Sequence, residues 1–206
     1  MSEFDTALLG NRCWLELATG ERIELTHDRW IRPPAGADGL LLDRCAGPTL
    51  DVGCGPGRLT AALTTRGVAA LGIDTSPTAV RLTRQRGAAA LHRDVFGPVP
   101  GEGRWRHVLL ADGNIGIGGD PAALLHRVGE LLGSRGTALV ELDPPGRGLR
   151  RDRVRIRSGA AVPGASWFTW AWLGLDALTE VIGKTALRVR WTTRWEQRWF
   201  AELERR

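Results

Sequence analysis

Residues 50–57 form a short glycine-rich segment, Leu-Asp-Val-Gly-Cys-Gly-Pro-Gly, in which glycines occupy alternate positions. An apolar run precedes this segment, and a helical pattern of apolar residues begins after it at Arg58. Glycine has no Cβ, so its backbone turns sharply and can lie close to a ligand. The segment therefore predicts a tight turn between a strand at 49–52 and a helix at about 58–66, with a ligand against the turn.

Short apolar runs alternate with helical stretches over roughly 48–143, which is typical of a parallel sheet covered by helices. Ser76 with Pro77, and Asp120 with Pro121, have the residue types of helix starts. Strands are expected at 49–52, 68–73, 88–91, 108–111 and 138–142. The pattern predicts an α/β fold with a doubly wound sheet.

Aspartates lie at the carboxyl ends of these expected strands. Asp51 lies within the glycine segment, Asp74 ends the second strand, and Asp94 and Asp112 follow the third and fourth. Ligands of open α/β sheets bind beyond the carboxyl ends of the strands. Asp51 and Asp74 suit a ligand that carries a cationic amino group and ribose hydroxyls, because carboxylate oxygens accept hydrogen bonds from both.

A dinucleotide-binding fingerprint would need a third glycine where this chain has Arg58, and Asp51 would lie unfavourably beside a pyrophosphate. No phosphate-binding G-x-x-x-x-G-K-[ST] loop occurs either. These departures disfavour a nicotinamide oxidoreductase and a nucleoside triphosphatase.

Over roughly 48–145 the chain resembles the class I S-adenosylmethionine-dependent methyltransferases. The resemblance implies a Rossmann-like, doubly wound, seven-stranded sheet, mostly parallel with an antiparallel strand near the C-terminus. It implies S-adenosylmethionine as cofactor and S-adenosylhomocysteine as product. Asp51 and the glycines would surround the methionine part, Asp74 would hold the ribose hydroxyls, and Asp94 with the Val95 backbone would lie near the adenine. The expected cofactor contacts are Asp51, Gly53, Cys54, Gly55, Gly57, Asp74, Thr75, Asp94, Val95, Asp112 and Asn114.

The segment after the fourth strand would face the transferring methyl group in this family. Its glycines would bring backbone near the sulfonium, and Asp112 or Asn114 would contact cofactor or substrate; a flexible connection is the alternative. Asp112 is also a candidate general base. His27 is a second one, since the N-terminal segment commonly closes over the substrate in small-molecule members; a surface pair with Asp28 is the alternative.

The flanks predict additional strands. Residues 12–25 have the pattern of a hairpin, 153–157 alternate strictly, and 187–203 suit a final strand or hairpin. Six of the nine tryptophans lie in the last 40 positions; we expect most in the core and one or two in the pocket. One domain is expected over 1–206, with an N-terminal cap (1–46), a cofactor-binding core (47–146), and a substrate-side insertion with C-terminal strands (147–206).

Composition narrows the remaining choices. A net charge of +5 and a pI near 10.3 permit a nucleic acid or an anionic small molecule without selecting one, since no long basic block occurs. Three cysteines without metal-like spacing fit reduced thiols and no metal site. No apolar run of membrane-spanning length and no secretion signal is visible, so a cytoplasmic monomer or homodimer is expected.

Asp143-Pro144-Pro145-Gly146 is similar to a motif of methyltransferases that act on amines, but it follows the fifth strand and lacks the aromatic residue. We interpret it as a turn. The leading functional hypothesis is methyl transfer to a small-molecule acceptor. Three alternatives stay open: an RNA or other macromolecule methyltransferase, an NAD(P)-dependent oxidoreductase, and a non-catalytic cofactor-binding protein.

Overall fold

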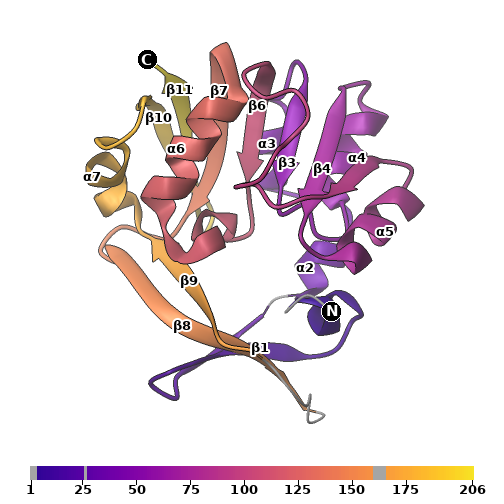
Figure 1. Ribbon diagram of the computed structural model, residues 1–206, viewed down its shortest axis with the longest axis vertical. Helices are drawn as coiled ribbons and strands as arrows, with labels where there is room; N and C mark the ends of the chain where they lie inside the picture. Colours follow the sequence, from indigo (N-terminus) through magenta and orange to yellow (C-terminus); the bar gives the residue numbers. More distant parts are fainter. Residues whose placement is uncertain (1–3, 26, 160–165) are drawn as a thin grey trace.

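A computed structural model describes residues 4–25, 27–159 and 166–206 of the chain. Two sheets make up its framework: a seven-stranded sheet and, below the carboxyl ends of its parallel strands, a four-stranded one (Figure 1). The seven-stranded sheet has the order β10-β11-β7-β6-β3-β4-β5. Its strands are β3 (Thr49–Val52), β4 (Ala70–Asp74), β5 (Ala89–His92), β6 (Trp105–Leu110), β7 (Leu132–Leu142), β10 (Leu187–Trp195) and β11 (Arg198–Arg205).

Five neighbouring strands of this sheet, from β7 to β5, run parallel, whereas β11 is antiparallel to both β7 and β10. The predicted Rossmann-like, mostly parallel sheet with an antiparallel C-terminal strand is therefore confirmed. The expected final segment is a hairpin, β10–β11, rather than a single strand.

Helices cover both faces of the sheet because its buried strands carry apolar side chains on both sides. On β6, Val108 and Leu110 pack in one core with helices α6 and α7, while Leu109 packs in another with α3 and α4. The helices are α3 (Asp38–Leu42), α4 (Arg58–Thr65), α5 (Pro77–Gln85), α6 (Pro121–Leu131) and α7 (Leu178–Ile182), which follows a 3₁₀ turn, η2 (Leu175–Ala177).

Two helix starts follow the local sequence signals. The Ser76 hydroxyl accepts a hydrogen bond from Ala79 N at 3.0 Å and Pro77 opens α5. Asp120 accepts from Ala122 N at 3.0 Å and Pro121 opens α6. These caps satisfy backbone N–H groups that a helix start otherwise leaves unpaired.

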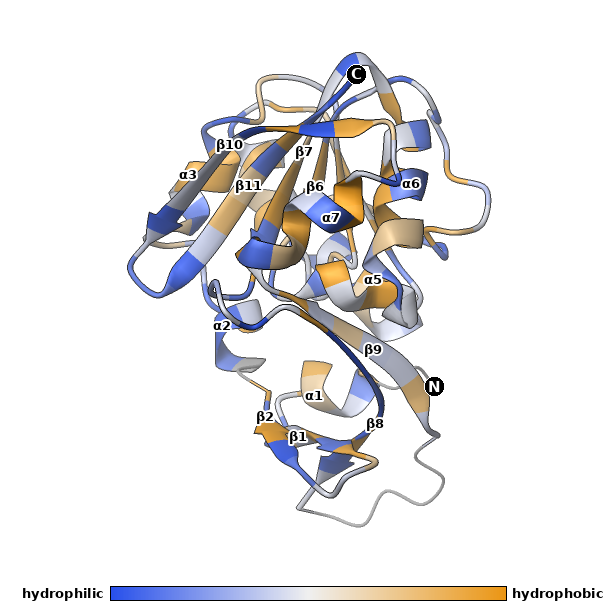
Figure 2. Ribbon diagram, turned by 90° about the vertical axis from the view of Figure 1, so that its left-hand side faces the viewer, coloured by the Kyte–Doolittle hydropathy of each residue, from blue (hydrophilic) through white to orange (hydrophobic). Residues whose placement is uncertain are grey.

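The four-stranded sheet, which we call the cap sheet, has the order β2-β1-β8-β9 and is antiparallel throughout. It joins the two flanks of the chain, as β1 (Cys13–Leu17) and β2 (Arg22–Glu24) form the expected hairpin, and β8 (Leu149–Ser158) and β9 (Phe168–Leu173) come from after the core. Two short helices, α1 (Asp5–Leu8) and α2 (His27–Ile31), accompany it (Figure 2).

Candidate functional site

The glycine segment leaves β3 with Gly53, Gly55 and Gly57 all at positive φ, between 54° and 79°. A Cβ on Gly53 would lie 2.8 Å from the Asn114 side chain, so this glycine is needed for packing within the protein. A Cβ on Gly55, in contrast, would meet only the tip of Leu8, at 3.9 Å. The backbone at Gly55 is therefore open to a ligand, as the sequence interpretation requires.

Asp51 is buried at the carboxyl end of β3, in front of the helix that follows the glycines. The Thr60 hydroxyl donates a hydrogen bond of 2.6 Å to Asp51 Oδ2. Burial, only partly offset by this hydrogen bond, raises the pKa of Asp51 to about 6. A cationic ligand group would favour the ionised form of such a carboxylate.

Asp74 lies one strand away and fixes the glycine segment to the end of β4. Its Oδ2 accepts from Gly55 N at 3.0 Å and its Oδ1 accepts from Ser76 N at 2.8 Å. A carboxylate oxygen can accept two hydrogen bonds, so each still has a free lone pair for a ribose hydroxyl. Burial raises the pKa of Asp74 against the effect of the two backbone donors. Its ribose role stays a prediction.

The residues expected around the adenine, Asp94 and Val95, line a cavity beyond the carboxyl ends of the parallel strands, which Asp51 and Asp74 also line. Asp94 Oδ1 accepts from Phe96 N at 3.0 Å, so this aspartate stabilises the turn after β5 and also lines the cavity. The Val95 carbonyl accepts from Arg127 Nε at 2.9 Å, and the Thr75 carbonyl lies 2.9 Å from His92 Nε2. Cys54 lines the cavity too, and burial raises the pKa of its thiol, consistent with a space-filling residue.

The segment after β6 lines the cavity with Gly113 and Gly118 and also packs against other parts of the protein. Asn114 Nδ2 donates to the carbonyls of Val52 and Gly53, at 2.8 and 2.9 Å, which ties the 3₁₀ helix η1 (Asn114–Gly119) to the glycine segment. A Cβ on Gly116 would lie within 3.0 Å of Ala171 O in β9. At least this glycine seats the cap sheet rather than approaching a sulfonium.

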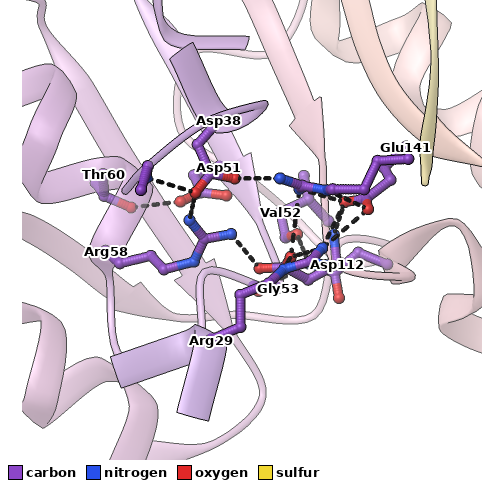
Figure 3. Close-up of polar contacts among 12 residues, drawn as sticks. Arg29, Asp38, Asp51, Val52, Gly53, Arg58, Thr60, Asp112 and Glu141 are labelled. Carbon is purple, nitrogen blue, oxygen red and sulfur yellow. Dashed lines mark hydrogen bonds and ion pairs between the residues drawn. The ribbon is translucent and has the colours of Figure 1, made fainter. Parts of the chain in front are cut away.

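Charged side chains of alternating sign form a closed ring, and two of them, Arg58 and Asp112, line the cavity. Figure 3 shows polar contacts of this ring. Ion pairs join neighbouring members in the order Arg29, Asp112, Arg58, Asp38, Arg198, Glu141 and back to Arg29, and Arg198 also lies 3.7 Å from Asp112 across the ring. The Nη2 of Arg58 lies 2.7 Å from Asp112 Oδ2, and the Nε of Arg198 lies 2.8 Å from Glu141 Oε1. We call these six residues the charge ring.

Asp38, Arg58 and Glu141 of the charge ring are buried and the other members are half-buried, and the ring members stabilise one another. Burial alone would raise the pKa values of Asp38 and Glu141, but the arginine contacts outweigh it and lower both. Arg29, on α2, is the most exposed member of the ring. Through Arg29, the ring thus connects helix α2, which accompanies the cap sheet, to the ends of β6 and β7.

The charge ring changes the interpretation of Asp112. Both of its oxygens accept from guanidinium groups, with Arg29 Nε at 2.8 Å from Oδ1, and its backbone N–H donates to Glu141 Oε2 at 2.7 Å. These contacts occupy the carboxylate that we had considered as a base. The other candidate, His27, is the first residue of α2, and its side chain lies outside the described part of the structure, as do residues 1–3, 26 and 160–165.

Sequence reasoning missed five of the six ring members as site residues. In the sequence, Arg58 is notable only as a departure from the dinucleotide fingerprint. No neighbouring residues indicate a site role for Asp38, Glu141 or Arg198, whose partners lie up to 160 positions away. The one signal present was Arg29, next to the His27-Asp28 pair. Long-range charge pairing leaves no periodicity in a sequence.

A cavity of about 610 Å³ lies between the carboxyl ends of the parallel strands and the cap sheet. Its polar half is formed by the glycine segment together with Asp51, Asp74, Asp94 and Asp112. Its apolar half is formed by side chains of the cap sheet and the short helices: Phe4, Leu8, Leu15, Ile23, Leu25, Trp30, Phe168, Trp170 and Trp172. Trp191, Trp195 and Trp199 lie on the C-terminal hairpin, away from these lining residues.

These residues fit S-adenosylmethionine. The backbone at Gly55 is open, two carboxylates have free lone pairs, and the buried Nε of Arg58, which lines the cavity, has no hydrogen-bond partner among the described residues. That unpaired donor suits a carboxylate such as the one on the amino-acid part of the cofactor. The volume falls within the usual range for ligand pockets, about 300–1,000 Å³.

Within residues 4–25, 27–159 and 166–206, no group of three or more His, Cys, Asp or Glu side chains is placed to hold a metal ion. In the same ranges no helix is long and apolar enough to cross a membrane.

Comparisons with known proteins agree with this geometry. Residues 49–132 match the family model of a methyltransferase domain. A search of the curated proteins finds no match. An S-adenosylmethionine-dependent methyltransferase from Bacteroides fragilis, solved with S-adenosylhomocysteine, has a similar structure with a TM-score of 0.78; 98% of this chain and 92% of that chain are covered at 17% identity.

Two further similar structures have named roles. The 1,6-didemethyltoxoflavin-N1-methyltransferase of Burkholderia thailandensis gives a TM-score of 0.61 at 17% identity, covering 82% of this chain and 76% of that one. The CcbJ methyltransferase of Streptomyces caelestis gives 0.64 at 16% identity, covering 85% and 92%. Residues 49–132 are therefore similar to a methyltransferase domain, and the chain has the Rossmann-like fold of these solved structures.

Proposed function

We propose that the protein transfers a methyl group from S-adenosylmethionine to a small-molecule acceptor held between the glycine segment and the cap sheet. The single observation that carries this proposal is the cavity of about 610 Å³, in which the open backbone at Gly55 and the carboxylates of Asp51 and Asp74 face an apolar wall. A cavity of this size suits a nucleoside cofactor and one small partner.

The cofactor, when bound, supplies an activated methyl group: a lone pair of the acceptor forms the new bond to the methyl carbon while the carbon–sulfur pair stays on sulfur. The chain's own residues bind and orient. Asp51 would face the cationic amino group, Asp74 the ribose hydroxyls, and Arg58 Nε the carboxylate. The cap sheet excludes water, so catalysis rests mainly on positioning and desolvation.

A base matters only for an acceptor that must lose a proton. Both carboxylate oxygens of Asp112 accept hydrogen bonds from guanidinium groups, so these contacts occupy the side chain. His27 remains a hypothesis. Replacing His27 by Ala tests it: a loss of kcat that grows as the pH rises would support a base role, because only the neutral imidazole accepts a proton, and an unchanged pH profile would reject it.

Two alternatives differ in what they need from this site. A macromolecule methyltransferase needs a basic, open groove, but several arginines of the cap sheet are paired with acids, such as Arg155 with Glu16 at 2.7 Å and Arg150 with Glu21 at 2.6 Å. An oxidoreductase would place a pyrophosphate beside Asp51. The paired arginines leave less positive charge for binding a polyanion, and the negative charge of Asp51 would repel the pyrophosphate. The small-molecule reaction of the Burkholderia enzyme is in line with the proposal.

The test is calorimetric titration of the full chain with S-adenosylhomocysteine, and with NADH and NADPH in parallel. Binding of S-adenosylhomocysteine alone supports the proposal. Binding of a dinucleotide instead would reject it. A third titration with single-stranded RNA at two salt concentrations addresses the macromolecular alternative, which predicts strong, salt-sensitive binding.

A further inference from the structure

The apolar half of the cavity is the inner face of the cap sheet. Leu15, Ile23, Phe168, Trp170 and Trp172 come from three of its strands and point to the same side, because side chains two apart share a face. The outer face carries the charges, such as Glu16 and Arg155. Among the described residues, the side chains that the cap sheet contributes to the cavity lining are therefore apolar, except for Thr169.

The aromatic side chains of this half interlock around Phe4. The ring centroid of Phe4 lies 5.5 Å from that of Trp170, 5.9 Å from that of Phe168 and 6.3 Å from that of Trp30, all in tilted or edge contacts. Phe168 and Trp170 meet at 90°. Such contacts hold the rings in fixed orientations, so they form a preformed wall rather than flexible side chains. A flat molecule can stack on this wall with little loss of side-chain freedom.

The charges that line the cavity disfavour an anion. Among the described residues, four carboxylates line it, against two guanidinium groups. Of those two, Arg58 is bound to Asp38 and Asp112, and Arg93 is exposed on the cofactor side and donates to the His92 carbonyl at 3.0 Å. A carboxylate or phosphate on the acceptor would lose its hydration beside Phe4 and Trp170 without gaining a cationic partner there.

We infer that the acceptor is a small, flat, largely apolar molecule without negative charge, stacked on the aromatic wall of Phe4, Trp30, Phe168 and Trp170. This inference rests on the proposed function, since the cofactor must fill the polar half. The shared cavity of about 610 Å³ then limits the acceptor to a few rings. Trp170 is the specificity-determining residue, because it contacts both Phe4 and Phe168.

The experiment uses 2-naphthol and 2-naphthoate, which share a ring system and differ in charge. Each is titrated by calorimetry into the full chain saturated with S-adenosylhomocysteine. We expect 2-naphthol to bind at least about tenfold more tightly than 2-naphthoate. Trp170→Ala should weaken 2-naphthol about tenfold and leave the affinity for S-adenosylhomocysteine unchanged. Trp170→Phe, which keeps a ring, should lose less.

The matched control is Trp195→Ala, which removes an indole that is 48% exposed on the C-terminal hairpin. It should change neither affinity. Equal or tighter binding of 2-naphthoate, no binding of either probe, or indifference of 2-naphthol to Trp170→Ala would each overturn the inference. Failure of S-adenosylhomocysteine to bind the unaltered chain would instead reject the proposed function, so the two failures are distinguishable.

Discussion

The two halves of the cavity are built in opposite ways. The polar half comes from one short segment, Gly53–Gly57, and from aspartates at the ends of adjacent parallel strands. The apolar half comes from widely separated parts of the chain, such as Phe4, Trp30 and Trp170. A parallel sheet brings consecutive strand ends together by its topology, whereas the wall exists only after β1 has paired with β8.

The charge ring and the seam between η1 and β9 join these two halves. Arg29 brings α2 to the ends of β6 and β7, and Gly116 lets β9 lie directly on η1. If the charge ring and the seam hold the two halves together, changes at these junctions should affect the stability of the whole molecule. Changes in the polar half should instead affect cofactor binding.

The largest effect is expected from Arg58→Met. The change leaves Asp38 and Asp112 buried without one of their cations, which should lower the free energy of unfolding by about 3–5 kcal/mol. Arg66→Met is the matched control on the same helix, since Arg66 pairs with Asp43 in an exposed position and should cost about 0–1 kcal/mol. Urea denaturation measures both. Similar losses for the two variants would show that the ring is not a junction.

The second prediction concerns Asp51 and pH. Its pKa of about 6 in the folded protein lies above the ordinary 3.8, so the folded state holds the proton more tightly than the unfolded state. The resulting stabilisation is complete below about pH 4 and is lost as the pH rises through 6. Relative to Asp51→Asn, the unaltered chain should therefore lose about 3 kcal/mol of unfolding free energy between pH 4 and 7.

Denaturant titrations at several pH values give this difference directly. A difference between the two chains that stays constant with pH would show that Asp51 titrates normally. With S-adenosylhomocysteine bound, the pH dependence should shrink, because the cationic amino group of the ligand favours the ionised carboxylate.

The third prediction separates cofactor binding from stability. Asp74→Asn keeps the shape of the side chain but replaces one acceptor oxygen by a donor, which should weaken S-adenosylhomocysteine binding by about 1.5–3 kcal/mol in calorimetry. Asp120→Asn, at the cap of α6 outside the lining residues, is the control and should leave the affinity unchanged. Unchanged affinity in folded Asp74→Asn would reject the ribose assignment.

The smallest effect is expected from Gly116→Ala, at the seam. The new methyl group would lie within 3.0 Å of Ala171 O and of the Trp170 indole, so β9 must move, at a cost of about 1–3 kcal/mol in unfolding free energy. Gly159→Ala serves as control, since no atom of the described residues lies within 4 Å of a Cβ at that position. Thermal unfolding compares them. Equal melting temperatures would mean that η1 and β9 are not tightly packed.

The sequence by itself determined the Rossmann-like sheet, the turn at Gly53–Gly57 and the helix starts at Ser76 and Asp120. Each depends on residues within a few positions of one another, through glycine's freedom at positive φ, the reach of a capping oxygen and the periodicity of apolar side chains. It also placed Asp51 and Asp74 at the correct edge of the sheet. Their roles toward the cofactor stay predictions.

Only the tertiary structure decided the rest. The strict alternation at 153–157 predicted a strand but not its partner, and Arg29 carried no sign of Asp112, 83 positions away. The run at 113–119 suggested backbone near a sulfonium, yet Gly116 serves strand packing. Ion pairs and side-chain stacking act through space and depend on which elements meet, so the charge ring and the aromatic wall appear only when the chain is folded.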